Sequence, residues 1–235
     1  TTTDSDYTDN DGTLTFSGVP GAQTITVVST TDNKVELDET FTVMLGAISG
    51  APPGVSVAGS PQTGTIANED AATISLAANV SQPESTTPQA FSVTLTNPVD
   101  VAVAVQFSTS DGTATTADND YTGIGSQTVT FPAGSNTAQS VNVAIVNDNK
   151  VEANEVYNTA IGTLVASGRN VNLGTTARTG TITNDDAAVV TLSGGGAANE
   201  GNTGTTSRIF TATLNNPVQG GFTLPYTTND GTATT

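Results

Sequence analysis

The chain has 235 residues, with 22 Asp and Glu against 5 Lys and Arg, a formal net charge of −17, and neither His nor Cys. Such an acidic surface repels nucleic-acid phosphates and anionic membrane surfaces, so neither is expected as a partner, and no apolar run approaches the roughly 18–20 residues of a membrane span. Without His and Cys, Ser-His-Asp and Cys-His catalysis, disulfides and ordinary zinc sites are excluded. Oxygen ligands remain, and these favour hard cations such as calcium.

Two long matches indicate that the chain is built from tandem repeats. The stretches 32–36 (DNKVE) and 64–72 (GTIANEDAA) recur as 148–152 (DNKVE) and 180–188 (GTITNDDAA), in both cases 116 residues later. Shorter matches pair 6–8 with 120–122, 94–99 with 213–218 and 111–116 with 230–235. The repeat is therefore a domain of about 115–119 residues rather than a short solenoid unit.

The phase of the matches predicts one complete domain between two partial ones. Residues 71–186 form a complete repeat (the central repeat), residues 1–70 the C-terminal part of a preceding repeat (the N-terminal piece), and residues 187–235 the N-terminal part of the next (the C-terminal piece). Two explanations stay open: the sequence is a window on a longer array, or the tail of one chain completes the head of its neighbour. In either case neither piece is expected to close its own core.

Alternating apolar and polar residues predict seven short strands in the central repeat. In chain order they cover residues 72–77, 91–96, 101–109, 127–131, 140–146, 157–165 and 179–183. Turn signals such as Asn97-Pro98 and Asp111-Gly112 separate them. Seven strands in a domain of this size are typical of an immunoglobulin-like β-sandwich, so the predicted fold class is all-β, with sandwiches in tandem.

Acidic residues gather in loops at four places in the central repeat. They are Glu84 after the first strand, 118–120 (DND) after the third, 148–155 after the fifth and 184–186 (NDD) after the last. Connections in a sandwich alternate between its two ends, so the loop after the fifth strand and the exit of the seventh fall at the same end. Carboxylates that converge there would form an oxygen ligand set of the kind calcium prefers.

These motifs in combination resemble the Calx-beta domain, a module known from sodium–calcium exchangers and bacterial surface proteins. The resemblance rests on DGTA (111–114) leading to Asp120-Tyr121, on VTFPAG (129–134), on residues 143–155 and on GTITNDD (180–186). It covers the whole central repeat and, by repetition, both pieces. It implies a β-sandwich that binds Ca²⁺ at one end, near the junction with the next domain.

The resemblance also nominates calcium ligands, position by position. They are Glu84, Asp120, Asp148, Glu152, Asp185 and Asp186 in the central repeat, with Glu155 as a weaker candidate; Asp6, Asp32, Glu36, Glu69 and Asp70 in the N-terminal piece; and Glu200 in the C-terminal piece. The family often has three consecutive acids where this chain has 147–149 (NDN) and 184–186 (NDD). Fewer charges indicate fewer or weaker ions, and roughly 0.1–1 mM is the affinity expected of an extracellular module.

Less specific interpretations of the same residues stay open. Asp120 and Asp6 can also cap a loop beside a packed tyrosine, and the other acids can be solvated loop residues. Asp111 is expected in a turn, and the two lysines, Lys34 and Lys150, as surface or internal charge partners. Because the acids recur with the repeat instead of forming one cleft, no enzymatic activity is expected.

A structural function follows from these features as an expectation. Calcium between sandwiches with almost no linker would stiffen the chain into a spacer of an extracellular adhesin or fibre at the bacterial cell surface. Its partners would be neighbouring repeats, other copies of the chain in a fibre, and cell-surface or matrix ligands. The alternative is a module that holds a glycan or protein ligand through calcium-ordered loops, although 5% aromatic residues and no Trp offer little for sugar stacking. A calcium sensor fits the repeated, strongly acidic chain less well.

Overall fold

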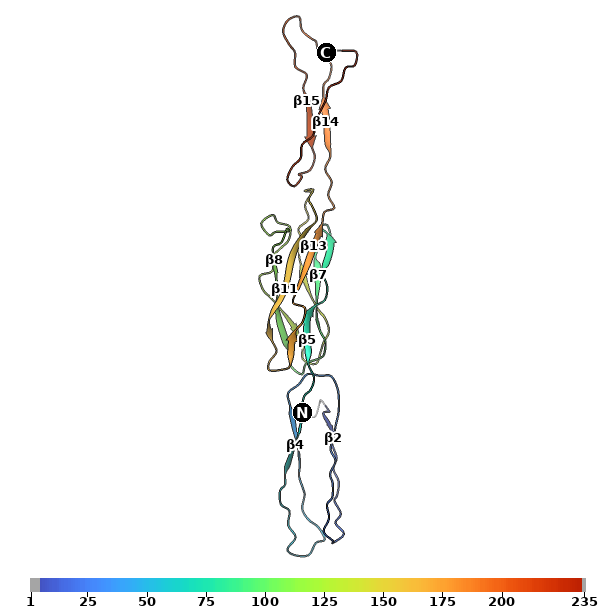
Figure 1. Cartoon of the computed structure of the whole chain (residues 1–235), viewed down its shortest axis with the longest axis vertical. Coiled ribbons are helices and arrows are strands. Elements are labelled where there is room, and N and C mark those ends of the chain that lie inside the picture. The colour runs from blue at the N-terminus through green and yellow to red at the C-terminus, as the bar shows by residue number, and fades with distance from the viewer. Residues whose placement is uncertain (1–4, 234–235) are drawn as a thin grey trace.

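The computed structural model describes residues 5–233, so the residues 1–4 and 234–235 of the two terminal pieces lie outside the described residues. Figure 1 shows the N-terminal piece, the central repeat and the C-terminal piece following one another along one long axis. The named elements of this part of the chain are all β-strands. None of its segments is a helix long and apolar enough to cross a membrane.

The central repeat is a sandwich of two sheets. Its strands are β5 (Ala72–Leu76), β6 (Val80–Pro83), β7 (Gln89–Leu95), β8 (Val103–Ser110), β9 (Gln127–Phe131), β10 (Gln139–Val143), β11 (Glu155–Val165), β12 (Val171–Leu173) and β13 (Ala177–Thr183). One sheet has the order β10-β7-β5-β12 and the other β6-β13-β11-β8-β9. The predicted fold class, all-β with tandem sandwiches, is confirmed.

Two short strands, β6 and β12, add to the seven that alternation predicts. After β5, which corresponds to the first predicted strand, the chain crosses to the opposite sheet. There it forms β6, which pairs in parallel with β13. Likewise β12 pairs in parallel with β5 before the chain crosses to β13. Each of the two pairs with one neighbour at a sheet edge and has only three or four residues, too few for a readable alternation.

The core lies between the sheets and follows the alternation of the strands. Every second residue of β5 is buried, and β7 and β8 show the same pattern over most of their length. Phe91, Phe107, Phe131 and Tyr157 are the largest side chains enclosed there. The Tyr157 hydroxyl donates a hydrogen bond of 2.8 Å to Gln89 Oε1, so the one polar end of this aromatic group is paired inside the core.

The two terminal pieces contain isolated antiparallel strand pairs. The N-terminal piece has β1 (Tyr7–Thr8) paired with β2 (Val28–Ser29) and β3 (Glu39–Val43) paired with β4 (Gln62–Ile66). The C-terminal piece has β14 (Val190–Gly194) paired with β15 (Phe210–Leu214). Phe16 and Phe210 are each 61% exposed in these pieces, which agrees with the expectation that neither closes a core.

Neighbouring segments of the chain contact one another through the same pair of loops at both junctions. The DNKVE loop of one segment meets the Asn-Pro-Val turn of the next, with parallel bridges between Val35 and Val99 and between Val151 and Val218. At the first junction the Val35 N–H donates to the Pro98 carbonyl (2.9 Å), and Val35 and Val99 are both buried. At the second the Val151 N–H donates to the carbonyl of the corresponding proline (3.0 Å). The junction is therefore a repeated structural unit.

Candidate metal centre

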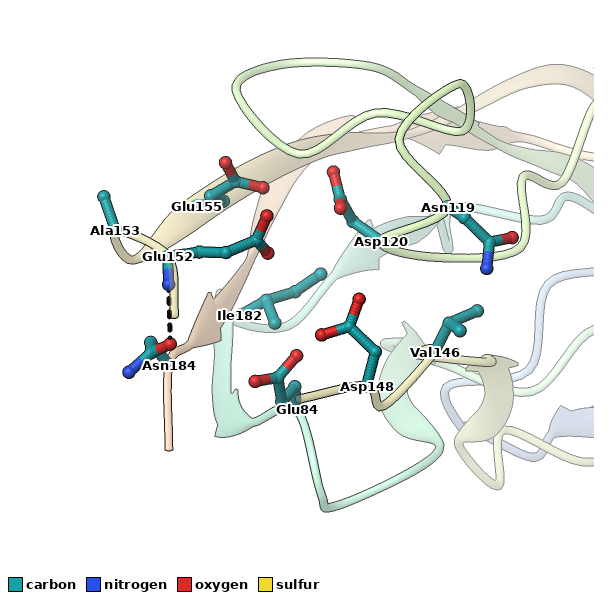
Figure 2. Close-up of a pocket in the computed structure, with 10 residues that line it drawn as sticks. All are labelled: Glu84, Asn119, Asp120, Val146, Asp148, Glu152, Ala153, Glu155, Ile182 and Asn184. Atoms are coloured by element: carbon teal, nitrogen blue, oxygen red, sulfur yellow. Dashed lines mark hydrogen bonds between the residues drawn. The ribbon is translucent and has the colours of Figure 1, made fainter. Parts of the chain in front are cut away.

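The four acidic loops of the central repeat converge on one pocket at the end that faces the C-terminal piece. Its lining consists of Glu84, Asn119, Asp120, Val146, Asp148, Glu152, Ala153, Glu155, Ile182 and Asn184. Figure 2 shows the carboxylates of Glu84 and Asp148 on one side of this pocket and those of Asp120, Glu152 and Glu155 on the other. The sandwich connectivity thus brings together acids that are up to 71 residues apart in the sequence, Glu84 and Glu155.

The DNKVE loop is held in place by its own polar side chains. Asp148 Oδ1 accepts a hydrogen bond from the Lys150 N–H (2.7 Å), which closes a tight turn. Asn184 Oδ1 accepts the Glu152 N–H (2.8 Å), while its Nδ2 donates to the Asp186 carbonyl (3.0 Å). Asn184 therefore ties the loop after the fifth predicted strand to the exit of the last one.

The first group of carboxylates at this end of the repeat is Glu84, which lines the pocket, with Asp185 and Asp186 beside it; the three offer oxygens within 4.8 Å of one another. Glu84 is only 5% exposed, and Glu84 Oε1 and Asp186 Oδ2 are buried without a hydrogen-bond partner in the described part of the chain. Burial, the closely neighbouring Asp186 carboxyl and the charges of Asp148 and Asp185 raise the pKa of Glu84 to about 7. This group is short of positive charge.

The second group is Asp118, Asp120 and Glu152, whose oxygens also lie within 4.8 Å of one another. Asp120 Oδ2 accepts the Thr115 N–H (2.6 Å), so one of its oxygens is already engaged. Lys150 Nζ forms an ion pair with Glu152 and lies 3.5 Å from Asp118 Oδ2. The bond to Glu152 is the main reason that the pKa of Lys150 is raised.

Asp120 is positioned by the aromatic residue that follows it. The Tyr121 ring stacks on Tyr157 at 4.4 Å between centroids, and its hydroxyl donates to Asp111 Oδ1 (2.7 Å). Asp111, expected in a turn, also accepts the Thr116 N–H (3.0 Å) and closes that loop. The pKa of Asp111 is lowered mainly by the Tyr121 hydroxyl bond. Asp111 thus contributes to the framework of the pocket and is absent from both carboxylate groups.

Glu155, the weaker candidate, connects the pocket to the next segment. Its Oε1 accepts a hydrogen bond of 2.9 Å from Gln219 Nε2, and Gln219 Oε1 in turn accepts the Ala153 N–H (3.3 Å). Desolvation is the largest cause of the raised pKa of Glu155. One side of the acidic pocket is therefore in direct contact with the C-terminal piece.

The N-terminal piece repeats this arrangement at the junction with the central repeat. All five residues nominated there, Asp6, Asp32, Glu36, Glu69 and Asp70, line one pocket. Asn68 Oδ1 accepts the Glu36 N–H (3.1 Å), as its counterpart Asn184 does for Glu152. The pKa of Glu39 is raised, first by a side-chain bond to Asp6.

The structure thus brings together the nominated residues of the central repeat and of the N-terminal piece. Glu200 is exposed in the C-terminal piece, where no other residue was nominated. Sequence reasoning missed Asp118, which lies beside the pocket residues Asp120 and Glu152, and Glu39, which lines the pocket of the N-terminal piece. Their signals were available: Asp118 precedes Asp120 by two residues, and Glu39 is the repeat equivalent of Glu155. Whether these residues bind a metal ion remains a prediction.

Fold and site together define a class: tandem β-sandwiches with an acidic, oxygen-rich pocket at the junction between repeats. The chain belongs to the Calx-beta family, because the model of the Calx-beta domain matches residues 1–72 and 67–187. A search of curated proteins finds no match.

Several solved structures are similar to this chain at low identity. The apo form of the Calx CBD1 domain is 21% identical, with a TM-score of 0.45, and the match covers 50% of this chain and 100% of that one. CBD12 from CALX1.2 is 22% identical, with a TM-score of 0.44, and the match covers 48% of this chain and 44% of that one. The Calx CBD2 domain is 14% identical, with a TM-score of 0.43, and the match covers 48% and 86%.

Proposed function

We propose that the chain is a non-enzymatic, calcium-stabilised spacer whose repeats are held in line at their junctions. The observation that carries the proposal is the pair of buried carboxylate oxygens without a hydrogen-bond partner, Glu84 Oε1 and Asp186 Oδ2, at the end of the repeat that contacts the next one. Membership of the Calx-beta family supports Ca²⁺ as the ion. An ion bound there supplies the positive charge that this group of acids lacks.

The chemistry of the donor set fits a hard cation. Glu84, Asp185 and Asp186 offer only oxygen, which Ca²⁺ accepts at coordination numbers of 6–8, whereas Mg²⁺ dehydrates reluctantly and demands a tighter octahedral geometry. Asp148, on the same side of the pocket as Glu84, is available to the same ion (Figure 2). The repulsion among these carboxylates would be replaced by attraction to a shared divalent charge.

The stiffening follows from the position of the DNKVE loop. Asp148 and Glu152 of this loop line the pocket, while Val151 between them forms the bridge to Val218 of the next segment. Asn216 contacts the same loop across the junction, since its Oδ1 accepts a hydrogen bond from Asn149 Nδ2 (3.3 Å). An ion that orders the loop therefore also orders the residue that docks the next repeat.

An extracellular location, in a bacterial adhesin or fibre, is part of the proposal. Extracellular calcium modules bind with affinities of roughly 0.1–1 mM, and an ion at 100 times its dissociation constant stabilises a domain by about 2.7 kcal/mol. That is a substantial part of the roughly 5–15 kcal/mol that stabilises a domain. The repeat would be ordered where calcium is abundant and loosened where it is scarce.

The terminal pieces support a proposal about how a fibre continues. Phe16 and Phe210, both 61% exposed, are the repeat equivalents of Phe131 and Phe91, which are fully buried in the central repeat. Each piece therefore presents the apolar face that the other half of a repeat covers. Two copies of this chain would join end to end by strand complementation, and sedimentation would detect this as association that depends on concentration.

Small-angle X-ray scattering of the full chain in EDTA and in calcium tests the spacer proposal. The expected result is a sharper, more rod-like scattering profile in calcium, at a concentration where the association state does not change. Identical profiles in both buffers would contradict a stiffening role. Binding of a glycan or protein that requires calcium, without a change in shape, would favour the alternative of a ligand-binding module.

A further inference from the structure

The two lysines of the chain occupy equivalent positions beside the two acidic pockets. Lys34 and Lys150 are the third residues of the repeated DNKVE loop. Lys150 Nζ pairs with Glu152 Oε1, and Lys34 Nζ lies 2.7 Å from Glu36 Oε1. The side chain of Lys150 is only 26% exposed and that of Lys34 only 18%, so both lie largely inside the protein rather than extending into solvent.

In the central repeat the Lys150 ammonium lies beside three carboxylates whose oxygens are close enough together to hold a metal ion. Asp118, Asp120 and Glu152 each offer an oxygen to the group, and Lys150 contacts two of the three. A divalent ion on the same oxygens would face the fixed positive charge of the lysine at short range, which disfavours its binding. The Glu84–Asp185–Asp186 group differs, since the ion pairs of Lys150 in the described part of the chain go to Asp118 and Glu152 and to none of its three members.

The local backbone explains why the lysine faces the acids. The Asp148 turn is followed by a short extended segment in which neighbouring side chains point in opposite directions. Val151 forms a bridge to the next segment, so the residues on either side of it, Lys150 and Glu152, share the opposite face, where they form an ion pair beside the pocket. The sequence order Lys-Val-Glu thus supplies a cation and its anion on one face and the docking residue on the other.

We propose that Lys150 is a tethered counter-ion that permanently occupies the Asp118–Asp120–Glu152 group and limits the central repeat to one calcium ion. The calcium ion then binds at Glu84, Asp185 and Asp186. Lys34 plays the same part beside Glu36 in the N-terminal piece. The proposal rests on the proposed calcium function, but it makes a separate statement about which group of carboxylates the protein neutralises with its own charge.

The test is the number of calcium ions bound by the full chain, measured by isothermal titration calorimetry and by equilibrium dialysis. The variants Lys150→Gln and Lys150→Met are expected to bind one more ion per chain than the unchanged protein. Adding Asp118→Asn to either variant should remove that extra ion. The matched control is Arg208→Gln, which removes one positive charge from the C-terminal piece and should leave the number unchanged.

A second readout needs no bound metal. In EDTA, Lys150→Gln should lower the melting temperature by several degrees, because three carboxylates lose their cation, and calcium should restore it. An unchanged calcium number in both Lys150 variants overturns the proposal, whatever the melting temperature. If the unchanged protein binds no calcium while the variants bind one ion, the counter-ion proposal stands and the proposed function fails.

Discussion

Replacing Glu84 by Gln distinguishes two effects of its charge. Without metal the charge destabilises the central repeat, and with calcium it stabilises the repeat as a ligand. Glu84 is buried among Asp148, Asp185 and Asp186, and its pKa of about 7 lies well above the ordinary value of 4.5. In metal-free protein at pH 8 its ionised form is therefore destabilising. An amide of the same shape carries no charge and removes that penalty, but it also removes a charged ligand for calcium.

The size of the effect follows from the pKa difference. The two pKa values of Glu84, 4.5 and about 7, differ by about 2.5, which at about 1.36 kcal/mol for each pH unit corresponds to roughly 3 kcal/mol of folding free energy. Glu84→Gln should therefore stabilise the metal-free central repeat by up to about 3 kcal/mol at pH 8. At pH 5 the gain should largely vanish, because the native carboxyl is then protonated. In calcium at about 100 times the dissociation constant, the unchanged protein gains about 2.7 kcal/mol and the variant much less. The stability advantage of Glu84→Gln over the unchanged protein should therefore shrink or reverse when calcium is added.

Hydrogen exchange of the amides in β7 and β11 of the full chain measures this local stability in EDTA and in calcium. Glu200→Gln is the matched control, because Glu200 holds the same repeat position but is exposed in the C-terminal piece. Glu200→Gln should leave the local stability of the central repeat unchanged both in EDTA and in calcium. Loss of stability in EDTA, or a calcium effect as large in Glu84→Gln as in the unchanged protein, would refute the reasoning.

Three further predictions concern the pocket, the first junction and the core. In EDTA the stability of the central repeat should fall as pH rises from 5 to 8, because native Glu84, with its raised pKa, binds a proton there that the unfolded chain has lost; urea unfolding at each pH measures this, and a rise would contradict the assignment. Val35→Ala should weaken the contact with buried Val99 by about 1–3 kcal/mol and broaden the scattering profile, while the second junction keeps its exchange protection. Tyr157→Phe should cost about 1–3 kcal/mol in urea unfolding, because Gln89 Oε1 loses its buried donor; an unchanged midpoint would show that this bond contributes little.

The strands and the convergence of the acids could be predicted because each leaves a direct trace in the sequence. Alternation marks strands such as β7 and β8, where every second side chain enters the core. The 116-residue repetition shows which acids belong to one domain, and sandwich connectivity then places the loops around Asp148 and Asp185 at the same end. The short edge strands β6 and β12 leave no such trace, because three or four residues are too few for a readable alternation.

The contacts that depend on side-chain direction could not be predicted. Nothing in the spacing of Glu155 and Gln219, 64 residues apart and in different repeats, indicates that they share a hydrogen bond. The same holds for Lys150, whose pairing with Glu152 follows from the turn at Asp148 and from the docking of the intervening valine. Sequence reasoning reaches the loops of the pocket, and the structure adds which charges meet within it.

The central claim is that the acidic pocket of each junction holds calcium and thereby stabilises the repeat. Thermal unfolding of the full chain in EDTA, then in rising calcium, with magnesium as the matched ion, tests it most directly. The account predicts that the melting temperature of the central repeat rises by several degrees in calcium and far less in magnesium, with the rise reduced in Glu84→Gln. No shift up to about 10 mM calcium, well above the affinities of extracellular modules, would contradict the account and leave the acids as solvated loop residues.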